Sequence, residues 1–513
     1  MRPVCLKPVD SRRSCSRSLR CFIACACCGI LAGCGAAEPP RPDGRPTPKP
    51  QSQVKKNGKR RPQPQPKVET ELAEEPRPTG PQTVEEPQAS KIQAIHRPND
   101  TRLKRDDVKL TERGFVKVSS QRIILYSDLP AQELNGLSEG VDQLYPALEA
   151  YFGPLPPDRA GTPYQMTGYL MSDVERFRAA GILSEGPAQS HEGWYLGNEF
   201  WWNRQATPYY TRHLMLHEAT HCFMHVMPSV DCPPWYVEGM AELFGTHSRD
   251  EQGKYLFGIF PSSSDQSPGW SRVNVLQDEI AAGKLADADQ ILAFKFDDYA
   301  RLPPYAWSWA FCHFLNNHPR YQVPFRKLAK GMMSGGFAAQ ATELFQPLLA
   351  DIRDEWLLFA SQIQYAHDIE RSAIEFQPGL ELAAPGKSSA MEILAARGWQ
   401  SSRVSLIAGR KYRVRATGRV TLATTTKPWI SEPQGISIRY FAGQPLGRLM
   451  GTIRPEPTGD ATNRDILKLI PLGPNTTFVA THTGTFYLRL NDAWNELADN
   501  AGDVQAEIEL LAD

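Results

Sequence analysis

The chain has 513 residues, and its 57 Lys and Arg side chains balance 57 Asp and Glu side chains. This length is sufficient for more than one domain, while the balanced charge gives no indication of a nucleic-acid partner. Seven of the ten cysteines lie at or before Cys34. No Cys-x-x-Cys pair follows Cys34, so the rest of the sequence does not predict a cysteine-based zinc site.

The first 33 residues have the pattern of an export signal. Five arginines precede or border a short apolar run over residues 21–33, which is too short to span a bilayer. The run ends in Leu31-Ala32-Gly33-Cys34, which resembles the lipobox of bacterial lipoproteins. This resemblance implies lipidation of Cys34 and anchoring of the mature protein to the bacterial cell envelope. The alternative is an ordinary secretory signal with an incidental cysteine, and either signal predicts export.

Residues 34–107 differ sharply in composition from the rest of the chain. Fourteen prolines lie between Pro39 and Pro98, interleaved with Gln, Lys, Glu and Thr, and large apolar residues are scarce. Such a segment cannot bury enough apolar surface to offset the entropy of ordering it. We therefore predict a disordered tether between the membrane anchor and the folded part.

Residues 108–375 have the pattern of a mixed α/β domain. Alternating apolar residues predict paired strands at 115–119 and 122–127, and a helical pattern follows over 130–152. Pro146 is expected to kink or break that helix. Residues 164–171 and 193–202 are further strand candidates, the first of them central. Later helices are predicted at 305–315, 324–334 and 338–363.

The sequence His-Glu-Ala-Thr-His at 217–221 carries the strongest chemical signal. On a helix, His217 and His221 lie one turn apart on one face, so both imidazoles can bind a single zinc ion. Glu218 lies beside them, within reach of a metal-bound water. Glu238, on the next predicted helix, can supply the third ligand of a His2Glu zinc site.

Glu242 lies one helical turn after Glu238 and is expected to accept a hydrogen bond from a zinc-binding histidine. The alternative is a pair of core helices whose histidines and glutamates satisfy one another. His225, one turn beyond His221, is interpreted as a supporting or core residue. Cys222 and Cys232 flank the connection between the two helices, and either a disulfide or free thiols fit that position.

HExxH followed by a helix of the form E-G-x-A-E resembles the gluzincin zinc metallopeptidases, and most closely the bacterial peptidase MA-like group. The resemblance implies that His217, His221 and Glu238 bind zinc, and that Glu218 is the general base. It also implies an edge strand before these helices that binds the substrate backbone.

The same resemblance implies a tyrosine or histidine, further along the chain, that stabilises the oxyanion formed during peptide hydrolysis. Tyr305 is the first candidate, and His313 is the second. Both belong to an apolar helical segment, where a structural role in the core is the alternative.

Residues 385–513 predict an all-β sandwich. Short alternating segments separated by turn signals are typical of such a fold. They lie at 404–406, 411–417, 420–423, 436–441, 478–480 and 485–490.

The last part of this region resembles the calcium loop of bacterial galactose-binding lectins. The resemblance implies calcium binding by Asp492, Asp499 and Asn500, together with the carbonyl of Glu496. This chain has Asp499 where those lectins have asparagine. The alternative is an acidic turn between two strands.

Together these patterns predict an α+β protein, in which a gluzincin-like peptidase domain (108–375) precedes an all-β, lectin-like domain (385–513). The expected function is hydrolysis of peptides or proteins by a membrane-tethered zinc metallopeptidase. The alternative is an inactive surface lipoprotein that binds glycan or protein through the sandwich. Zinc is the expected cofactor, calcium and carbohydrate are further ligands to test, and no nucleic-acid partner is expected.

Overall fold

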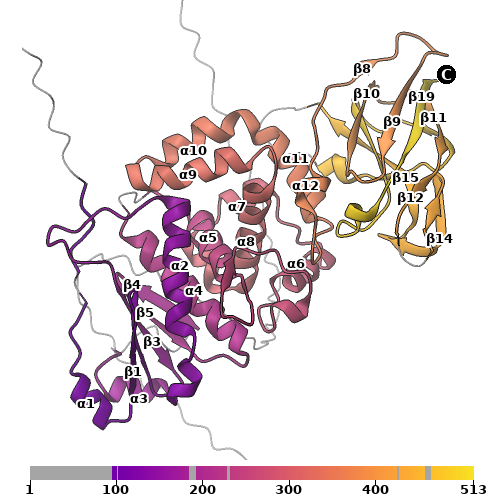
Figure 1. Cartoon of the computed structure of the whole chain (residues 1–513). Helices are drawn as coiled ribbons and strands as arrows, with labels where there is room; N and C mark the ends of the chain where they lie inside the picture. The colour runs from indigo at the N-terminus through magenta and orange to yellow at the C-terminus, as the bar shows by residue number, and fades with distance from the viewer. Residues whose placement is uncertain are drawn as a thin grey trace, which may run out of the picture. The chain divides into compact units, whose positions relative to one another are not determined.

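The structure, a computed structural model, describes residues 95–100, 102–183, 192–227, 231–424, 427–456 and 464–512. The predicted export signal, Cys34 and most of the predicted tether lie outside these residues. The described part is a mixed α+β fold with a β-rich C-terminal region (Figure 1). Among the described helices, none combines the length and apolarity needed to cross a bilayer.

A five-stranded mixed sheet forms the first part of the fold, in the order β1-β2-β3-β5-β4. Strands β2, β3 and β5 are parallel to one another, whereas the outer strands β1 and β4 pair antiparallel with their neighbours. The bounds are Val116–Ser119 for β1, Ile123–Ser127 for β2, Met166–Met171 for β3, Gly193–Leu196 for β4 and Glu199–Asn203 for β5. Strand β4 is therefore a free edge of this sheet.

The two faces of the sheet bury different sets of side chains, because successive residues of a strand point to opposite faces. In β5, Phe200 and Trp202 join the main core together with apolar residues of α2 (Leu137–Phe152) and α4 (Pro208–His225). Trp201 lies on the opposite face, in a smaller cluster with residues of α1 (Asp107–Glu112) and α3 (Val174–Ala179). Helices therefore cover both faces.

Helices dominate the chain after the sheet. They are α5 (Pro234–Gly245), α6 (Arg272–Ala281), α7 (Ala288–Leu292), α8 (Leu302–Asn317), α9 (Gln322–Ser334), α10 (Phe337–Phe345), α11 (Leu349–Ala360) and α12 (Ile369–Ser372), with a small hairpin of β6 (His247–Arg249) and β7 (Tyr255–Phe257).

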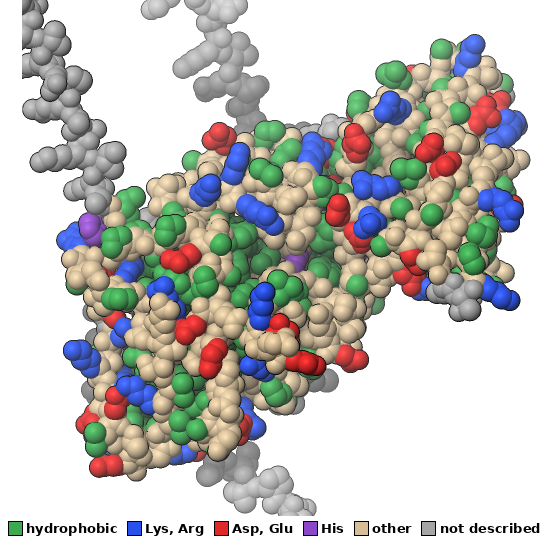
Figure 2. All heavy atoms as spheres, in the orientation of Figure 1, with side chains coloured by type: hydrophobic (Ala, Val, Ile, Leu, Met, Phe, Trp, Pro, Cys, Tyr) green, Lys and Arg blue, Asp and Glu red, His purple; other side chains and the backbone are tan. Residues whose placement is uncertain are grey.

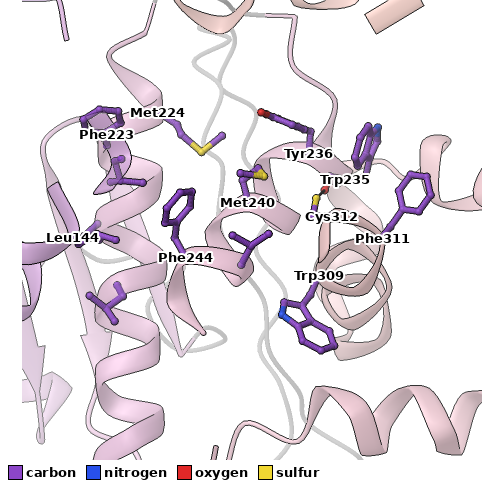
Figure 3. Packing of buried hydrophobic residues seen from close by; sticks show 14 of the residues in the cluster. Leu144, Phe223, Met224, Trp235, Tyr236, Met240, Phe244, Trp309, Phe311 and Cys312 are labelled. Atoms are coloured by element: carbon purple, nitrogen blue, oxygen red, sulfur yellow. Dashed lines mark hydrogen bonds between the residues drawn. The ribbon is translucent and has the colours of Figure 1, made fainter. Parts of the chain in front are cut away.

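Helix α5 packs between α4 and α8, and this packing brings the predicted metal-binding helices together. Met240 and Phe244 of α5 lie in the apolar layer shared with Phe223 of α4 and Trp309 of α8 (Figure 3). Gly239 lies directly against α8, since a Cβ at this position would be 2.5 Å from the Cys312 sulfur. The absence of a side chain therefore permits the close approach of the two helices.

The C-terminal region is a sandwich of two antiparallel-rich sheets around its own apolar core. One sheet has the order β14-β15-β18-β10-β8, with β16 added beside β15, and the other has the order β17-β11-β19-β9. The strands are β8 (Leu380–Glu381), β9 (Ser388–Leu394), β10 (Gln400–Leu406), β11 (Lys411–Gly418), β12 (Val420–Thr421), β13 (Ile430–Ser431), β14 (Gln434–Phe441), β15 (Gln444–Pro455), β16 (Ile470–Pro471), β17 (Asn475–Val479), β18 (Gly484–Leu490) and β19 (Asp503–Leu510).

The folded part extends beyond two of the boundaries expected from the sequence. Residues from Ile95 onward already belong to the folded part, because buried Arg97 donates to the carbonyl of Thr162 and lies 3.6 Å from the Asp158 carboxylate. These polar contacts are not visible in the proline-rich composition that suggested a tether up to residue 107. The sandwich includes β8, which pairs with β10 before the predicted start at residue 385.

Several predicted elements also differ in detail. The predicted strand 193–202 is a hairpin, because Gly197 adopts a positive φ of 63° and reverses the chain between β4 and β5. Helix α2 continues through Pro146 without a break. The predicted helix 338–363 is divided into α10 and α11 by a short 3₁₀ turn that contains Pro347.

Candidate metal centre

Helix α4 begins at a well-defined cap and runs through the core. The Thr207 side chain accepts from the backbone N–H of Tyr210, and Pro208 occupies the first helical turn. Residues Leu214 to Met224 are all buried. Three histidines, His213, His217 and His221, follow at intervals of four residues, so their side chains lie along one face of the helix.

The next helix, α5, brings one carboxylate to these histidines. Glu238 Oε2 lies 3.2 Å from His221 Nε2 and 3.5 Å from His217 Nε2. The two Nε2 atoms are 3.0 Å apart. All three side chains are at most 2% exposed. Three ligand atoms therefore converge on one small buried volume, as a His2Glu metal site requires.

Glu238 is ionised in this arrangement. Burial raises its pKa, but the neighbouring imidazoles of His221 and His217 outweigh that effect and hold the pKa at about 2. A permanently charged carboxylate beside two imidazoles is a suitable donor set for a divalent cation.

Glu218 lies in the same region but has different surroundings. Its side chain is fully buried, and neither carboxylate oxygen has a hydrogen-bond partner among the described residues. Burial raises the pKa of Glu218 to about 8. Strand β4 passes directly over it, since a Cβ on Gly193 would lie 2.6 Å from Glu218 Oε1. The carboxylate is therefore positioned by packing rather than by hydrogen bonds.

Glu242 supports His217 from the side away from Glu238. Its Oε1 lies 3.6 Å from His217 Nδ1. Arg272 binds both oxygens of Glu242, at 2.8 Å through Nη2 and 3.1 Å through Nε, and the indole N–H of Trp270 donates to Oε2 at 3.1 Å. Burial raises the pKa of Glu242, but Arg272 and His213 more than offset this and keep the carboxylate charged.

His213, His217 and Glu242 form a second group with metal-ligand spacing. The Arg272 guanidinium already neutralises the carboxylate of this group, and a divalent cation beside it would meet a fixed positive charge. His213 Nε2 instead lies 3.3 Å from Glu242 Oε2. We therefore interpret His213 and Glu242 as residues that hold His217 in place, and not as the ligands of a second metal ion.

An aromatic residue of the edge strand covers the other histidine. Tyr195 of β4 stacks on His221, with ring centroids 4.8 Å apart and planes inclined by 15°. Tyr195 also contacts His225 edge-on at 5.7 Å. His225 is exposed and lies next to the cluster, which fits the supporting role and not the core role that the sequence also left open.

The two oxyanion candidates lie in different places. The Tyr305 ring is fully buried, with its centroid 6.2 Å from that of His217. His313 is two helical turns further along α8, about 12 Å away at 1.5 Å per residue. It packs between Trp309 and Phe260, and burial lowers its pKa to about 3. His313 is therefore a core residue, which is the alternative that the sequence left open for it.

Cys222 and Cys312 are buried free thiols. Cys222 is buried, and its sulfur points to the carbonyl of Glu199 at 3.7 Å in the sheet. Because the side chain faces the core, it is unavailable to Cys232. The disulfide alternative for this pair was wrong.

The predicted calcium residues are brought together in part. Asp492 is buried and accepts from the backbone of Ala493 at 2.7 Å and from the Asn500 amide at 2.9 Å. The remaining amide oxygen, Asn500 Oδ1, is buried without a partner in the described structure. Asp499, by contrast, is exposed.

Sequence reasoning missed four residues that surround the cluster: Gly193, Tyr195, His213 and Arg272. His213 had a usable signal, since it continues the four-residue spacing of His217 and His221. Gly193 and Tyr195 belong to the predicted strand segment 193–202, but nothing in the sequence singles out these two residues. Arg272 comes from a distant segment that only the fold brings to α4.

Comparisons with known proteins add a partial structural likeness. No protein-family model matches the chain, and no curated protein matches it. Among solved structures, the chain is similar to one described as "EclA N-terminal domain; PllA-like lectin", with 19% sequence identity and a TM-score of 0.19. The likeness covers 24% of this chain and 94% of the lectin chain. These comparisons assign the chain to no family.

Proposed function

We propose that this protein is a zinc metallopeptidase of the gluzincin type, with His217, His221 and Glu238 as the zinc ligands. The convergence of these three side chains from α4 and α5 carries the proposal. Their ligand atoms are separated by 3.0, 3.2 and 3.5 Å. Tetrahedral zinc with bonds of about 2.0–2.1 Å needs ligand atoms about 3.3 Å apart, so the donor set fits this ion.

The carboxylate of Glu218, which has no hydrogen-bond partner among the described residues, favours a catalytic zinc site over a structural zinc site. Burying a carboxylate without hydrogen bonds is unfavourable, and a protein that used zinc only for stability would not need it. Bound zinc would supply an activated water and polarise the peptide carbonyl. Glu218 would take one proton from the attacking water and return it to the leaving amine.

Two further groups would assist this reaction. Tyr305, next to His217, is the candidate donor to the oxyanion that develops as the carbonyl is attacked. Glu242, held by Arg272 and Trp270, would orient His217 through its Nδ1 atom and so fix the direction of Nε2.

The decisive experiment compares Glu218→Gln with His217→Ala in the exported form of the protein. The Gln variant should bind about one zinc per chain, as the wild type does, but lose peptide hydrolysis by a factor of about 1,000 or more. The Ala variant should lose both zinc and activity. Zinc content would be measured by elemental analysis and hydrolysis with a casein-derived peptide mixture. Unchanged hydrolysis in Glu218→Gln would exclude Glu218 as the general base.

Calcium binding by the sandwich is a second candidate function, and carbohydrate is the ligand class that it suggests. The Asn500 side chain supports it, because its buried Oδ1 has no partner among the described residues and its amide nitrogen donates to Asp492 Oδ2 at 2.9 Å, so both side chains lie together. Oxygen donors gathered on one loop are the ligands that calcium prefers. Melting curves with and without about 1 mM calcium would test this, with Asp492→Asn as the control. An identical melting temperature in both buffers would reject the calcium site.

We also propose that the protein is exported and anchored through a lipid on Cys34, with the proline-rich segment as a tether. Metabolic labelling with a palmitate analogue in a bacterial host would test this. Label should enter the wild type and be absent from Cys34→Ala. Equal labelling of both proteins would contradict lipidation at this residue.

A further inference from the structure

A groove of about 440 Å³ lies on the sandwich, in a part of the chain remote in sequence from the α4–α5 cluster and from the Asp492 loop. It is bordered by three segments: the connection at 373–377, strand β9 and the first residues of β10. Its volume is within the range of ligand-binding pockets. The groove is open on one side, and polar and apolar groups both line it.

One wall of the groove is an unpaired strand edge. Strand β9 is the last strand of its sheet and pairs with β19 on one side. The backbone N–H of Ala395 donates to Gly502 on the β19 side, so the alternating groups of Leu394, Glu392 and Ala390 point the other way. Ala390 and Glu392 line the groove and are exposed.

A side chain already occupies the first position along this edge. The Gln400 amide accepts from the Leu394 N–H and donates to the Leu394 carbonyl, both at 3.0 Å. A backbone peptide group on a neighbouring strand would form the same two hydrogen bonds with Leu394. The edge is therefore able to extend its hydrogen-bond ladder, and the next sites, Glu392 and Ala390, are free for a ligand.

Two arginines provide a charged feature at the same groove. Neither the Arg397 nor the Arg403 side chain forms an ion pair or a hydrogen bond with another described residue. Arg403 also has a positive φ of 56°, at the point where the β10–β18 register shifts. Such a conformation costs about 1 kcal/mol or more for a non-glycine residue and is frequent at binding sites.

We propose that this groove binds an extended peptide as an additional strand on β9, with a carboxylate of the peptide at Arg397 and Arg403. The backbone groups of Glu392 and Ala390 would supply the hydrogen bonds, in line with the Gln400 amide. The two guanidinium groups would then select acidic or C-terminal carboxylates. The proposal does not depend on the zinc site, since none of the residues that line the groove belongs to α4 or α5.

The test uses a fluorescein-labelled hexapeptide, Thr-Val-Thr-Val-Thr-Asp, with a free C-terminus, and fluorescence anisotropy with the full chain. Saturable binding is expected below about 1 mM. Glu392→Pro should weaken it at least tenfold, because proline removes an outward N–H at the edge. Thr477→Pro on β17 is the matched control, since β17 is the opposite edge of the same sheet and Thr477 is exposed; it should bind as the wild type does.

Two peptides methylated on alternate backbone nitrogens keep the test valid even if a proline variant fails to fold. The peptide whose methyl groups replace the N–H groups that face β9 should lose binding to the wild-type protein. The peptide methylated on the nitrogens that face away from β9 should bind within about twofold of the unmethylated one. Replacing both arginines by glutamine should weaken the free-acid peptide at least fivefold and leave unchanged a C-terminally amidated peptide that has Asn in place of Asp and so carries no carboxylate. Absence of saturable binding, equal loss in both proline variants, or equal binding of both methylated peptides would overturn the proposal.

Discussion

At the scale of single residues, the surroundings of two buried carboxylates near His217 shift their pKa values in opposite directions. Glu238 faces two imidazoles and has a pKa of about 2, whereas Glu218 has no partner among the described residues and a pKa of about 8. One group is thus suited to hold a cation and the other to exchange a proton.

The contact between Gly193 and Glu218 gives a first prediction. In Gly193→Ala the new Cβ would lie 2.6 Å from Glu218 Oε1, so the carboxylate must rotate away. We expect peptide hydrolysis to fall about 10- to 100-fold with zinc content unchanged. Gly336→Ala is the control, because a Cβ there meets no atom within 4 Å and the residue has a negative φ. Equal activity of the two variants would contradict the prediction.

His313 gives a prediction about pH. Its folded pKa of about 3 lies below the ordinary value of about 6.5, so the unfolded chain binds a proton that the folded chain does not. The neutral ring therefore contributes full stability above pH 6.5, and this contribution is lost as the pH falls toward 3. At pH 5 the loss is about 2 kcal/mol.

His313→Phe should consequently flatten the decline in unfolding free energy between pH 7 and pH 5, as measured by urea titration at both values. Hydrolysis at pH 7.5 should stay within about twofold of wild type, because the residue packs in the core away from His217. An unchanged pH slope would show that His313 is not buried as a neutral ring.

The sequence was sufficient to predict the residues of the central cluster but not those around it. His217, His221, Glu218 and Glu238 carry a spacing that follows from helix geometry, so their convergence could be anticipated. Arg272 reaches Glu242 from 30 positions further along the chain, and nothing local to either residue signals the contact. The choice between Tyr305 and His313 could not be made from the sequence, because an apolar helix gives no information about which of its turns faces a site.

At the scale of elements, the approach of α5 to α8 determines where Glu238 lies. In Gly239→Ala the added Cβ would meet the Cys312 sulfur at 2.5 Å and the Ser308 carbonyl oxygen at 2.7 Å. The helices must separate, which we expect to cost about 1–3 kcal/mol and to move the adjacent Glu238. Zinc affinity, measured by chelator competition, should fall at least tenfold.

Cys312→Ala serves as the control for that experiment, because it removes the sulfur without adding a clash. Combined with Gly239→Ala it should restore part of the stability but not all, since the Ser308 carbonyl oxygen remains in place. Full zinc affinity in Gly239→Ala alone would show that α5 can shift without moving the ligand.

Element types were easier to predict than element limits. Strong periodicity gave the positions of β2, β3, α2 and the two metal-binding helices, and the structure confirms these elements. The break between β4 and β5 was missed although Gly197 and Asn198 interrupt the apolar run, and the positive φ of Gly197 reverses the chain there. Strands β9, β15 and β19 were also missed. Strand β9 is largely exposed and β15 is a run of mostly buried residues, so neither alternates clearly, whereas β19 does alternate and its pattern was overlooked.

At the scale of the whole molecule, the described surface mixes both signs of charge. On the face drawn in Figure 2, Lys and Arg side chains are interspersed with Asp and Glu side chains. A few of these charges form less exposed pairs. Arg454 of β15 donates to Asp354 at 2.7 Å and to Asp351 at 2.6 Å, both on α11. This contact joins residues a hundred positions apart.

Arg454→Met should therefore destabilise the fold by about 2 kcal/mol, because two partly buried carboxylates lose their shared cation. Burial already raises the pKa of Asp354, so its charge depends on this arginine. Arg353→Met is the matched control, since its partner Asp289 is more exposed. Differential scanning calorimetry of both variants would measure the effect, and equal melting temperatures would contradict it.

The four-residue spacing of His213, His217 and His221 has a consequence for how this gene can change. Every added or deleted residue within α4 rotates the following turns by about 100°. One inserted codon between His213 and His217 would thus turn His217 and His221 away from α5 together, whereas many point changes would leave the register intact. Length variation among natural versions of this protein is therefore expected in the connecting loops and not inside α4.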